Sequence, residues 1–340
     1  MSKARIKGIL TPNLVPLDRN GNIAEDELRR YVEWLVQKGV SGLYPNGSTG
    51  EFTRFSPEER REIIRIVASQ VNGRVPVLAG AAEATVRDTL AACAVYAEMG
   101  CTAAAICAPY YFKLSQDSVG EYFAELARHT ELDIVLYNIP QFANEISLDT
   151  IERLADFPRI VGIKDSSRDF PRFLNLINRM RPRRPDFSIL IGTEEIILPA
   201  LLMGGDGGTI ATSGIVPEVV MKLYALAESG KIEEARKIQF KLLELINVML
   251  FGAGFPEGFR AAASLRGFVM GQSRQPLSPK EKCDLNAVRQ TLHCILSEHG
   301  FVAEIEGAVG CEPLAQDASP SEAEIQAIVA EVVRQMRTNR

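Results

Sequence analysis

Short apolar segments alternate with longer segments of helical periodicity, and this pair repeats eight times before residue 230. The apolar segments lack helical spacing and are typical of buried strands in a parallel sheet. They are Ile6–Val15, Gly42–Tyr44, Val75–Ala79, Ala103–Cys107, Ile134–Tyr137, Ile160–Ile163, Ser188–Ile191 and Gly207–Ala211. The helical segments are Glu25–Lys38, Ser56–Ser69, Thr85–Met99, Ser115–His129, Ser147–Ala155, Phe170–Asn178, Ile196–Met203 and Val216–Ser229. Eight strand–helix units predict an α/β fold, a (β/α)8 barrel. An open doubly wound sheet is the alternative, but no Gly-x-Gly-x-x-Gly sequence follows the first strand.

Lys164 directly follows the apolar segment Ile160–Ile163 and therefore stands at the carboxyl end of the sixth predicted strand. Most lysines are solvated, so a simple strand-end charge is the plainer interpretation. Reactive groups of parallel barrels, however, lie at the carboxyl ends of the strands. A neutral amine there would be a Schiff-base nucleophile, and it would need burial because a free lysine has a pKa of about 10.4. The residues at neighbouring strand ends favour this second interpretation.

Three other features fall at predicted strand ends. The loop Gly47–Glu51 follows the second strand, and its glycines and hydroxyls suit a small anion such as a carboxylate, although such loops are usually only turns. Tyr137 ends the fifth strand, where core packing is the plainer interpretation of a tyrosine. Tyr110 and Tyr111 follow the fourth strand. We therefore expect these side chains to meet Lys164 at one end of the barrel.

Composition excludes several classes of protein. The 340 residues are 46% hydrophobic and 24% charged, with a net charge of −5, as in a soluble globular protein. No basic block of the size that nucleic acid requires is present. We expect neither a secretory signal nor a membrane span. We therefore expect a cytoplasmic location. The six cysteines lack CxxC spacing and are interpreted as reduced thiols. The three histidines form no ligand cluster at the predicted strand ends, so we expect no metal.

Four motifs occur together in this order: GSTGE at 47–51, PYYF at 109–112, YNIP at 137–140 and GIKDSS at 162–167. This combination resembles the pyruvate-dependent class I aldolases of the dihydrodipicolinate synthase and N-acetylneuraminate lyase family, over residues 6–298. The resemblance implies a β/α barrel, a homotetramer, a lysine Schiff base, and no metal or organic cofactor. A catalytically silent scaffold is the alternative from another class, and the joint presence of the motif residues disfavours it.

The resemblance also implies roles for individual residues. Lys164 matches the Schiff-base lysine and Tyr137 the tyrosine that relays protons. Ser48 and Thr49 match the pair that binds the pyruvyl carboxylate, with the Ser48 hydroxyl also in the proton relay. Tyr111 matches a tyrosine that is donated to the site of a neighbouring subunit. The candidate substrate-binding residues are Gly47, Ser48, Thr49, Phe142, Gly192, Glu194, Glu195 and Thr212.

The substrate is less narrowly defined. The synthase branch of the family carries an arginine two residues past its YNxP motif, whereas this chain has Phe142. Loss of the guanidinium removes the partner of a second carboxylate and disfavours lysine biosynthesis. The segment Gly192–Glu195 resembles the lyase branch, in which acidic groups bind substrate hydroxyls. We therefore expect retro-aldol cleavage of a 2-keto acid, such as a 2-keto-3-deoxy sugar acid, to pyruvate and an aldehyde. A dihydrodipicolinate synthase-like condensation and a keto-deoxy acid dehydratase are the alternatives.

The remainder of the chain predicts three further parts. Residues 231–298 follow the barrel of residues 1–230 as a helical cap, with helices at Lys231–Leu250, Glu257–Phe268 and Pro279–Glu298. Residues 299–319 are a predicted linker. Residues 320–340 have an apolar stripe of helical spacing, which comprises Ile325, Ile328, Val329, Val332, Val333 and Met336. This segment resembles the encapsulation peptides of bacterial microcompartments, and shell proteins are its expected partners; docking on its own barrel is the alternative.

Overall fold

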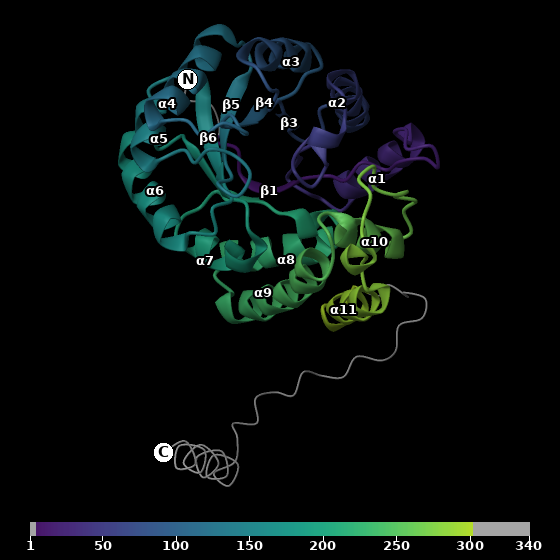
Figure 1. Ribbon diagram of the computed structural model, residues 1–340. Helices are drawn as coiled ribbons and strands as arrows, with labels where there is room; N and C mark the ends of the chain where they lie inside the picture. Colours follow the sequence, from purple (N-terminus) through teal and green to yellow (C-terminus); the bar gives the residue numbers. More distant parts are fainter. Residues whose placement is uncertain (1–4, 302–340) are drawn as a thin grey trace, which may run out of the picture. The chain divides into compact units, whose positions relative to one another are not determined.

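The computed structural model describes residues 5–301, and within them eight parallel strands form a nearly closed barrel (Figure 1). The strands are β1 (Gly8–Thr11), β2 (Gly42–Leu43), β3 (Leu78–Gly80), β4 (Ala103–Cys107), β5 (Asp133–Asn138), β6 (Ile160–Asp165), β7 (Ser188–Ile191) and β8 (Gly207–Thr209). Their order is β2-β1-β8-β7-β6-β5-β4-β3, and a parallel bridge between Leu43 and Val77 joins the two ends of the sheet. The predicted (β/α)8 barrel is confirmed.

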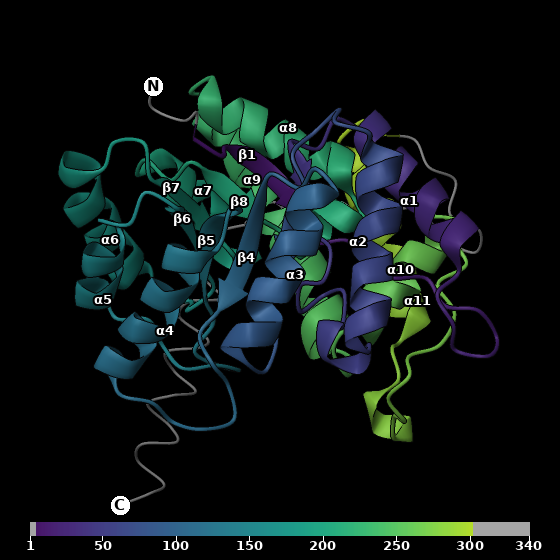
Figure 2. The same cartoon turned by 90° about the horizontal axis from the view of Figure 1, so that it is seen from above.

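Eight helices cover the outer face of the strands, as the amphipathic segments predict. They are α1 (Glu25–Gln37), α2 (Pro57–Val71), α3 (Val86–Glu98), α4 (Gln116–His129), α5 (Leu148–Leu154), α6 (Phe170–Arg183), α7 (Ile197–Leu202) and α8 (Pro217–Glu228). In Figure 2, α4 and α5 lie outside β4 and β5. Helix α2 begins with a capping box, in which Ser56 and Glu59 satisfy each other's backbone N–H groups. Helix α6 extends past the predicted Asn178 because Met180 continues its buried stripe.

The interior of the barrel is filled by alternate residues of each strand. In β4, Ala103, Ala105 and Cys107 face the interior, where they pack with Tyr44 and Tyr137 in one cluster of buried residues. Ala104 and Ile106 belong to the larger cluster between the strands and the helices. The small side chains of β4 leave room for the two tyrosine rings, whose centroids lie 6.1 Å apart at an interplanar angle of 84°.

Three helices follow the barrel: α9 (Ile232–Ile246), α10 (Glu257–Leu265) and α11 (Leu285–Glu298). Helix α9 packs on α7 and α8, and α11 packs on α9 and α10. The predicted helix Lys231–Leu250 changes at Asn247 into a π-helical turn, Asn247–Phe251. The predicted helix Pro279–Glu298 was wrong as one element, since Pro279–Glu281 forms a separate 3-10 turn. The Asp284 carboxylate accepts hydrogen bonds from the backbone N–H groups of Asn286 and Ala287 and so starts α11 anew.

The predicted domain limits remain predictions. The predicted amphipathic segment 320–340 lies outside the described residues, as does most of the linker 299–319. Within residues 5–301, no helix has the length and apolar character that crossing a membrane requires.

Candidate active site

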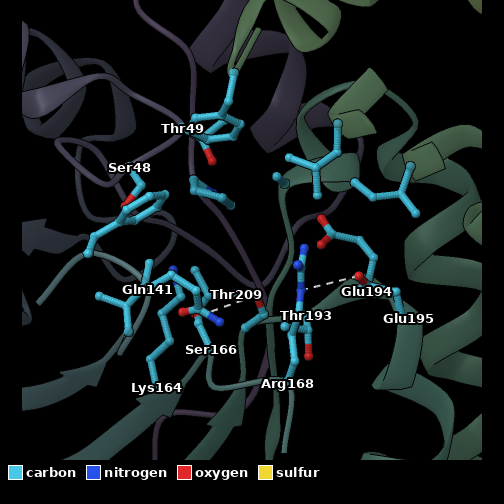
Figure 3. A pocket seen from close by; sticks show the side chains of 18 of the residues that line it. Ser48, Thr49, Gln141, Lys164, Ser166, Arg168, Thr193, Glu194, Glu195 and Thr209 are labelled. Atoms are coloured by element: carbon cyan, nitrogen blue, oxygen red, sulfur yellow. Dashed lines mark hydrogen bonds and ion pairs between the residues drawn. The ribbon is translucent and has the colours of Figure 1, made fainter. Parts of the chain in front are cut away.

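A cavity of about 250 Å³ lies at the carboxyl ends of the strands. Its floor comes from the residues that end or follow β1, β2, β5, β6, β7 and β8. Its outer wall comes from the end of α9, the first turn of α10 and the chain between them. In the view of Figure 3, Ser48 and Thr49 stand on one side of the cavity and Glu194 and Glu195 on the other. Reactive groups of parallel barrels lie at this end of the strands, so the cavity is the candidate active site.

Lys164 stands at the bottom of the cavity. Its backbone pairs in register with Tyr137 on the neighbouring strand, which directs both side chains to the interior of the barrel. Its side chain is buried, and Nζ lies 4.0 Å from the ring centroid of Tyr137 and 4.7 Å from that of Tyr44. Burial lowers the pKa of the amine to about 7, against the opposing effect of the Glu194 carboxylate. A substantial fraction of Lys164 is therefore neutral and nucleophilic at neutral pH.

The Tyr137 hydroxyl lies next to a second hydroxyl. Its oxygen is 3.3 Å from Ser48 Oγ, and either group can donate the hydrogen bond. Burial raises the pKa of Tyr137 to about 12, while hydrogen bonds with Ser48 and Ser166 lower it. The phenol is therefore protonated at neutral pH and has a hydroxyl partner through which a proton can pass.

The loop that carries Ser48 and Thr49 is fixed from both sides. On one side, Gly80 of β3 donates its N–H to the carbonyl of Pro45 over 2.9 Å. A Cβ at Gly80 would stand 2.1 Å from the Asn46 carbonyl oxygen, so only glycine permits this approach. On the other side, the buried carboxylate of Glu51 forms an ion pair with Arg260 of α10.

The opposite wall carries acidic groups. Glu194 is buried, and its Oε1 accepts a hydrogen bond of 3.0 Å from the backbone N–H of Thr212. Burial raises the pKa of Glu194 to about 7, so its carboxyl is partly protonated at neutral pH. Glu195 is more exposed and forms an ion pair of 3.4 Å with Arg168. The wall therefore presents both hydrogen-bond donors and hydrogen-bond acceptors.

Most of the residues predicted from the sequence line this cavity: Lys164, Tyr137, Ser48, Thr49, Phe142, Gly192, Glu194 and Glu195. Three predicted residues are not part of its lining. Gly47 packs against the Tyr44 ring, and Thr212 is fully buried behind Glu194. Tyr111 is 92% exposed and has a positive φ of 82°. Gly192 provides space, because a Cβ there would lie 2.9 Å from Lys164 Cε.

Several lining residues were missed from the sequence. Arg168 and Gln141 follow β6 and β5, and a survey of every polar residue after each strand would have found them. An apolar wall has no comparable sequence signal, because it depends on how the cap packs over the barrel. It comprises Ile246, Leu250, Phe251, Phe255 and Phe259. Within residues 5–301, no group of His, Cys, Asp and Glu side chains is arranged to hold a metal ion.

Residues 5–295 match the model of the dihydrodipicolinate synthetase family. The chain belongs to this family. A 4-hydroxy-tetrahydrodipicolinate synthase of Methanopyrus kandleri is 33% identical over 292 residues, which are 85% of this chain and 96% of the relative. Members of this family are pyruvate-dependent lyases, and the chain is a class I carbon–carbon lyase.

Solved structures of other members have the same fold. One is a prophage protein of the dihydrodipicolinic acid synthase family from E. coli K12 in complex with pyruvate. It has a TM-score of 0.79 and 27% identity, and the match covers 88% of this chain and all of that one. Another is a 2-keto 3-deoxygluconate aldolase from Picrophilus torridus. It has a TM-score of 0.73 and 28% identity, and the match covers 79% of this chain and 96% of that one.

The pKa of Lys164 predicts its reactivity toward an acylating reagent such as acetic anhydride. Only the neutral amine reacts, so labelling of Lys164 is expected to rise with pH through a midpoint of about 7 and then level off. Exposed lysines, whose ordinary pKa is about 10.4, provide the internal comparison in the same peptide digests. Mass spectrometry of the digests measures both.

Glu194→Gln tests whether the Glu194 carboxylate raises the pKa of Lys164. The carboxylate favours the protonated lysine, so its removal should move the midpoint of Lys164 labelling to lower pH. A midpoint near 10 in the unaltered protein would contradict the burial of the amine.

Proposed function

We propose that this enzyme cleaves a 2-keto acid to pyruvate and an aldehyde through a Schiff base on Lys164. The observation that carries the proposal is the buried amine of Lys164, which stands over the ring of Tyr137 and has a pKa of about 7. A neutral amine in a cavity beside a protonated phenol matches the needs of imine chemistry, which requires a nucleophile first and a proton carrier afterwards.

The steps follow from the positions of the side chains. The carboxylate of the keto acid binds at Ser48 and Thr49, and the amine of Lys164 attacks the carbon-2 carbonyl. The carbonyl oxygen leaves as water with a proton from Tyr137, which gives the protonated imine and the Tyr137 phenolate. Tyr137, as the phenolate, takes the proton from the hydroxyl on carbon 4. The bond between carbons 3 and 4 then breaks, its electrons enter the imine to form an enamine, and the aldehyde leaves. Tyr137 returns a proton to carbon 3, and hydrolysis of the imine releases pyruvate and frees the lysine.

When the imine forms, Tyr137 gives up its proton through Ser48 to the hydroxyl group that leaves carbon 2 as water, so the phenolate is generated in that step and can then act as a base. The 3.3 Å contact between the two oxygens provides the path. The high pKa of Tyr137 makes its phenolate a strong base once formed, which suits removal of a proton from an aliphatic hydroxyl.

The substrate that we propose is a 2-keto-3-deoxy sugar acid. Glu194 and Glu195 line the wall opposite Ser48 and Thr49, where acceptors for substrate hydroxyls are needed. Similarity to the 2-keto 3-deoxygluconate aldolase of Picrophilus torridus supports this choice. A synthase reaction, as in the Methanopyrus relative, is the second candidate, and Phe142 disfavours it because it supplies no charge to a second carboxylate. A dehydratase acting on a related keto-deoxy acid is also compatible with these residues.

We further propose that Tyr111 completes the site of a neighbouring copy in a homotetramer. Tyr111 and Phe112 form an edge-to-face pair, with ring centroids 5.0 Å apart, and are 92% and 73% exposed. Such exposed aromatic pairs are typical of contact surfaces. A second cavity of about 380 Å³ shares Ser48 and Tyr137 with the first and is large enough to admit a tyrosine ring from another copy.

Finally, we propose that residues 320–340 are an encapsulation peptide that targets the enzyme into a microcompartment. The support is the apolar stripe of the sequence and the chemistry of the reaction. Cleavage releases an aldehyde, and confinement would hold that reactive product near the enzyme that consumes it.

Reduction with borohydride in the presence of pyruvate tests the Schiff base. The unaltered protein should gain the mass of one reduced pyruvyl group per chain, located at residue 164 by peptide mapping. Lys164→Ala should gain none. Lys237→Ala, which removes an exposed lysine of α9, should label as the unaltered protein does. An adduct on Lys164→Ala, or on neither protein, would contradict the proposal.

Mixed oligomers test the donation of Tyr111. Lys164→Ala and Tyr111→Ala should each be nearly inactive alone. When the two are co-expressed, a site that has Lys164 and receives an intact Tyr111 is complete. Random pairing then restores about a quarter of the wild-type sites. Pyruvate release by the purified mixture measures the recovery, and a mixture no more active than its components would show that Tyr111 acts within its own subunit or not at all.

Deletion of residues 319–340 tests the targeting proposal. The shortened enzyme should keep its activity and fail to co-fractionate with co-expressed shell proteins. Co-fractionation equal to that of the full chain would refute the proposal without affecting the chemistry.

A further inference from the structure

Arg168 is held in an uncommon backbone conformation at the rim of the active-site cavity. Its φ is +64°, a region that side chains other than glycine seldom occupy. Hydrogen bonds on both sides fix the turn: Asp165 Oδ1 accepts from the N–H of Ser167 over 2.8 Å, and Ser167 Oγ accepts from the N–H of Asp169 over 3.2 Å. Such strain persists only where the surrounding structure enforces it, and it is concentrated at functional sites.

The side chain of Arg168 forms the far end of the cavity together with Glu195. Its Nε lies 3.4 Å from Glu195 Oε1, and its guanidinium carbon lies 5.4 Å from the ring centroid of Phe251. Both side chains line the cavity, as does Gln141, whose Nε2 lies 3.5 Å from the carbonyl oxygen of Ser167. Figure 3 shows the Arg168–Glu195 contact on the opposite side of the cavity from Ser48 and Thr49.

An extended keto acid would place its distal carbons at this ion pair. Its carboxylate is assigned to Ser48 and Thr49 and its second carbon to Lys164, so carbons 5 and 6 extend toward Arg168 and Glu195. This assignment rests on the proposed function. A hydroxyl group can accept a hydrogen bond from a guanidinium and donate one to a carboxylate at the same time. Paired donors and acceptors of this kind are complementary to a polyhydroxylated chain.

A substrate with an anionic group at its distal end would not find such complementary groups at this ion pair. The charge of Arg168 is already compensated by Glu195, and a second carboxyl group, Glu194, lies in the same wall. A phosphate or carboxylate on carbon 6 would have to break the ion pair and stand beside Glu195. Like charges in a partly desolvated site repel, so this end of the cavity disfavours an anionic terminus.

We propose that the Arg168–Glu195 ion pair determines substrate specificity: it binds the distal hydroxyls of a 2-keto-3-deoxy acid whose distal end is polyhydroxylated and uncharged, and it excludes substrates with a distal phosphate or carboxylate. Arg168 thus takes a different role from the arginine that Phe142 replaces. It serves as a hydrogen-bond donor to hydroxyls and not as a counter-ion.

Three substrates separate these properties: 2-keto-3-deoxygluconate, its 6-phosphate, and 4-hydroxy-2-oxopentanoate, which has no distal hydroxyls. Pyruvate release gives kcat/KM for each. The unaltered enzyme should prefer the hexonate, whose distal end is uncharged, to its 6-phosphate by at least about tenfold, the magnitude of one hydrogen bond to a charged group. Arg168→Gln should lower kcat/KM for the hexonate far more than for the pentanoate, chiefly through KM.

Glu195→Gln provides the readout that a purely structural role would not give. The substitution keeps the size of the side chain and releases the charge of Arg168, so kcat/KM should fall for the hexonate and rise for the 6-phosphate. The double variant Arg168→Gln/Glu195→Gln should lose this gain. Glu233→Gln, which breaks an exposed ion pair with Arg236 on α9, is the matched control and should leave the preference unaltered.

Borohydride trapping with pyruvate separates the failure of this inference from that of the proposed function. If the unaltered enzyme forms the adduct but cleaves the 6-phosphate as well as the hexonate, or does not cleave the hexonate, the specificity role is overturned. It is also overturned if Glu195→Gln does not shift the preference. If no adduct forms, the proposed function fails and the specificity role fails with it.

Discussion

The structure depends on keeping one amine out of water while leaving it within reach of a water-soluble acid. The Lys164 amine lies among the aromatic faces of Tyr44 and Tyr137, and burial removes the hydration that would otherwise hold its proton. Gly192 leaves space beside its side chain, and the small residues of β4 leave space for the rings. The end of α9, the first turn of α10 and the chain between them complete the enclosure with apolar side chains. The barrel interior is thus shaped around a single side chain.

The charged groups in and around the cavity differ in their depth and in whether they are paired. The deepest groups, Lys164 and Glu194, both have a pKa near 7, so at neutral pH the innermost part of the site carries little fixed charge. The other charged groups near the site are paired: Glu195 with Arg168 at the rim of the cavity, and the buried Glu51 with Arg260 beside the loop of Ser48 and Thr49. Pairing weakens the electrostatic effect that each of these charges would otherwise have on the Lys164 amine. It also leaves the incoming carboxylate as the principal unpaired charge in the site.

The sequence predicted what is determined locally. Eight alternations of strand and helix, each repeated within about 30 residues, indicated the barrel, and residues such as Lys164 and Tyr137 were found because they end strands. Errors arose where a boundary depends on packing. Helix α6 extends to Arg183 because Met180 is buried against the rest of the structure. The start of α11 at Leu285 is a different case, because the Asp284 cap is a local signal that the prediction of one long helix overlooked. The apolar wall and the Arg168–Glu195 contact join segments that are distant in sequence. No local sequence pattern predicts such contacts.

The ion pair between Glu51 and Arg260 joins residues that are 209 positions apart. The loop of Ser48 and Thr49 leaves the ribosome early, whereas its anchor on α10 is made near the end of the barrel and cap. At ordinary rates of synthesis, roughly 10 to 40 s separate the two events. Until then the loop of Ser48 and Thr49 lacks one of its two supports, although the residues of β1 to β3 have already been synthesised. The nascent chain therefore acquires its binding site last, and a product cut short before residue 260 has most of the barrel but no anchored site.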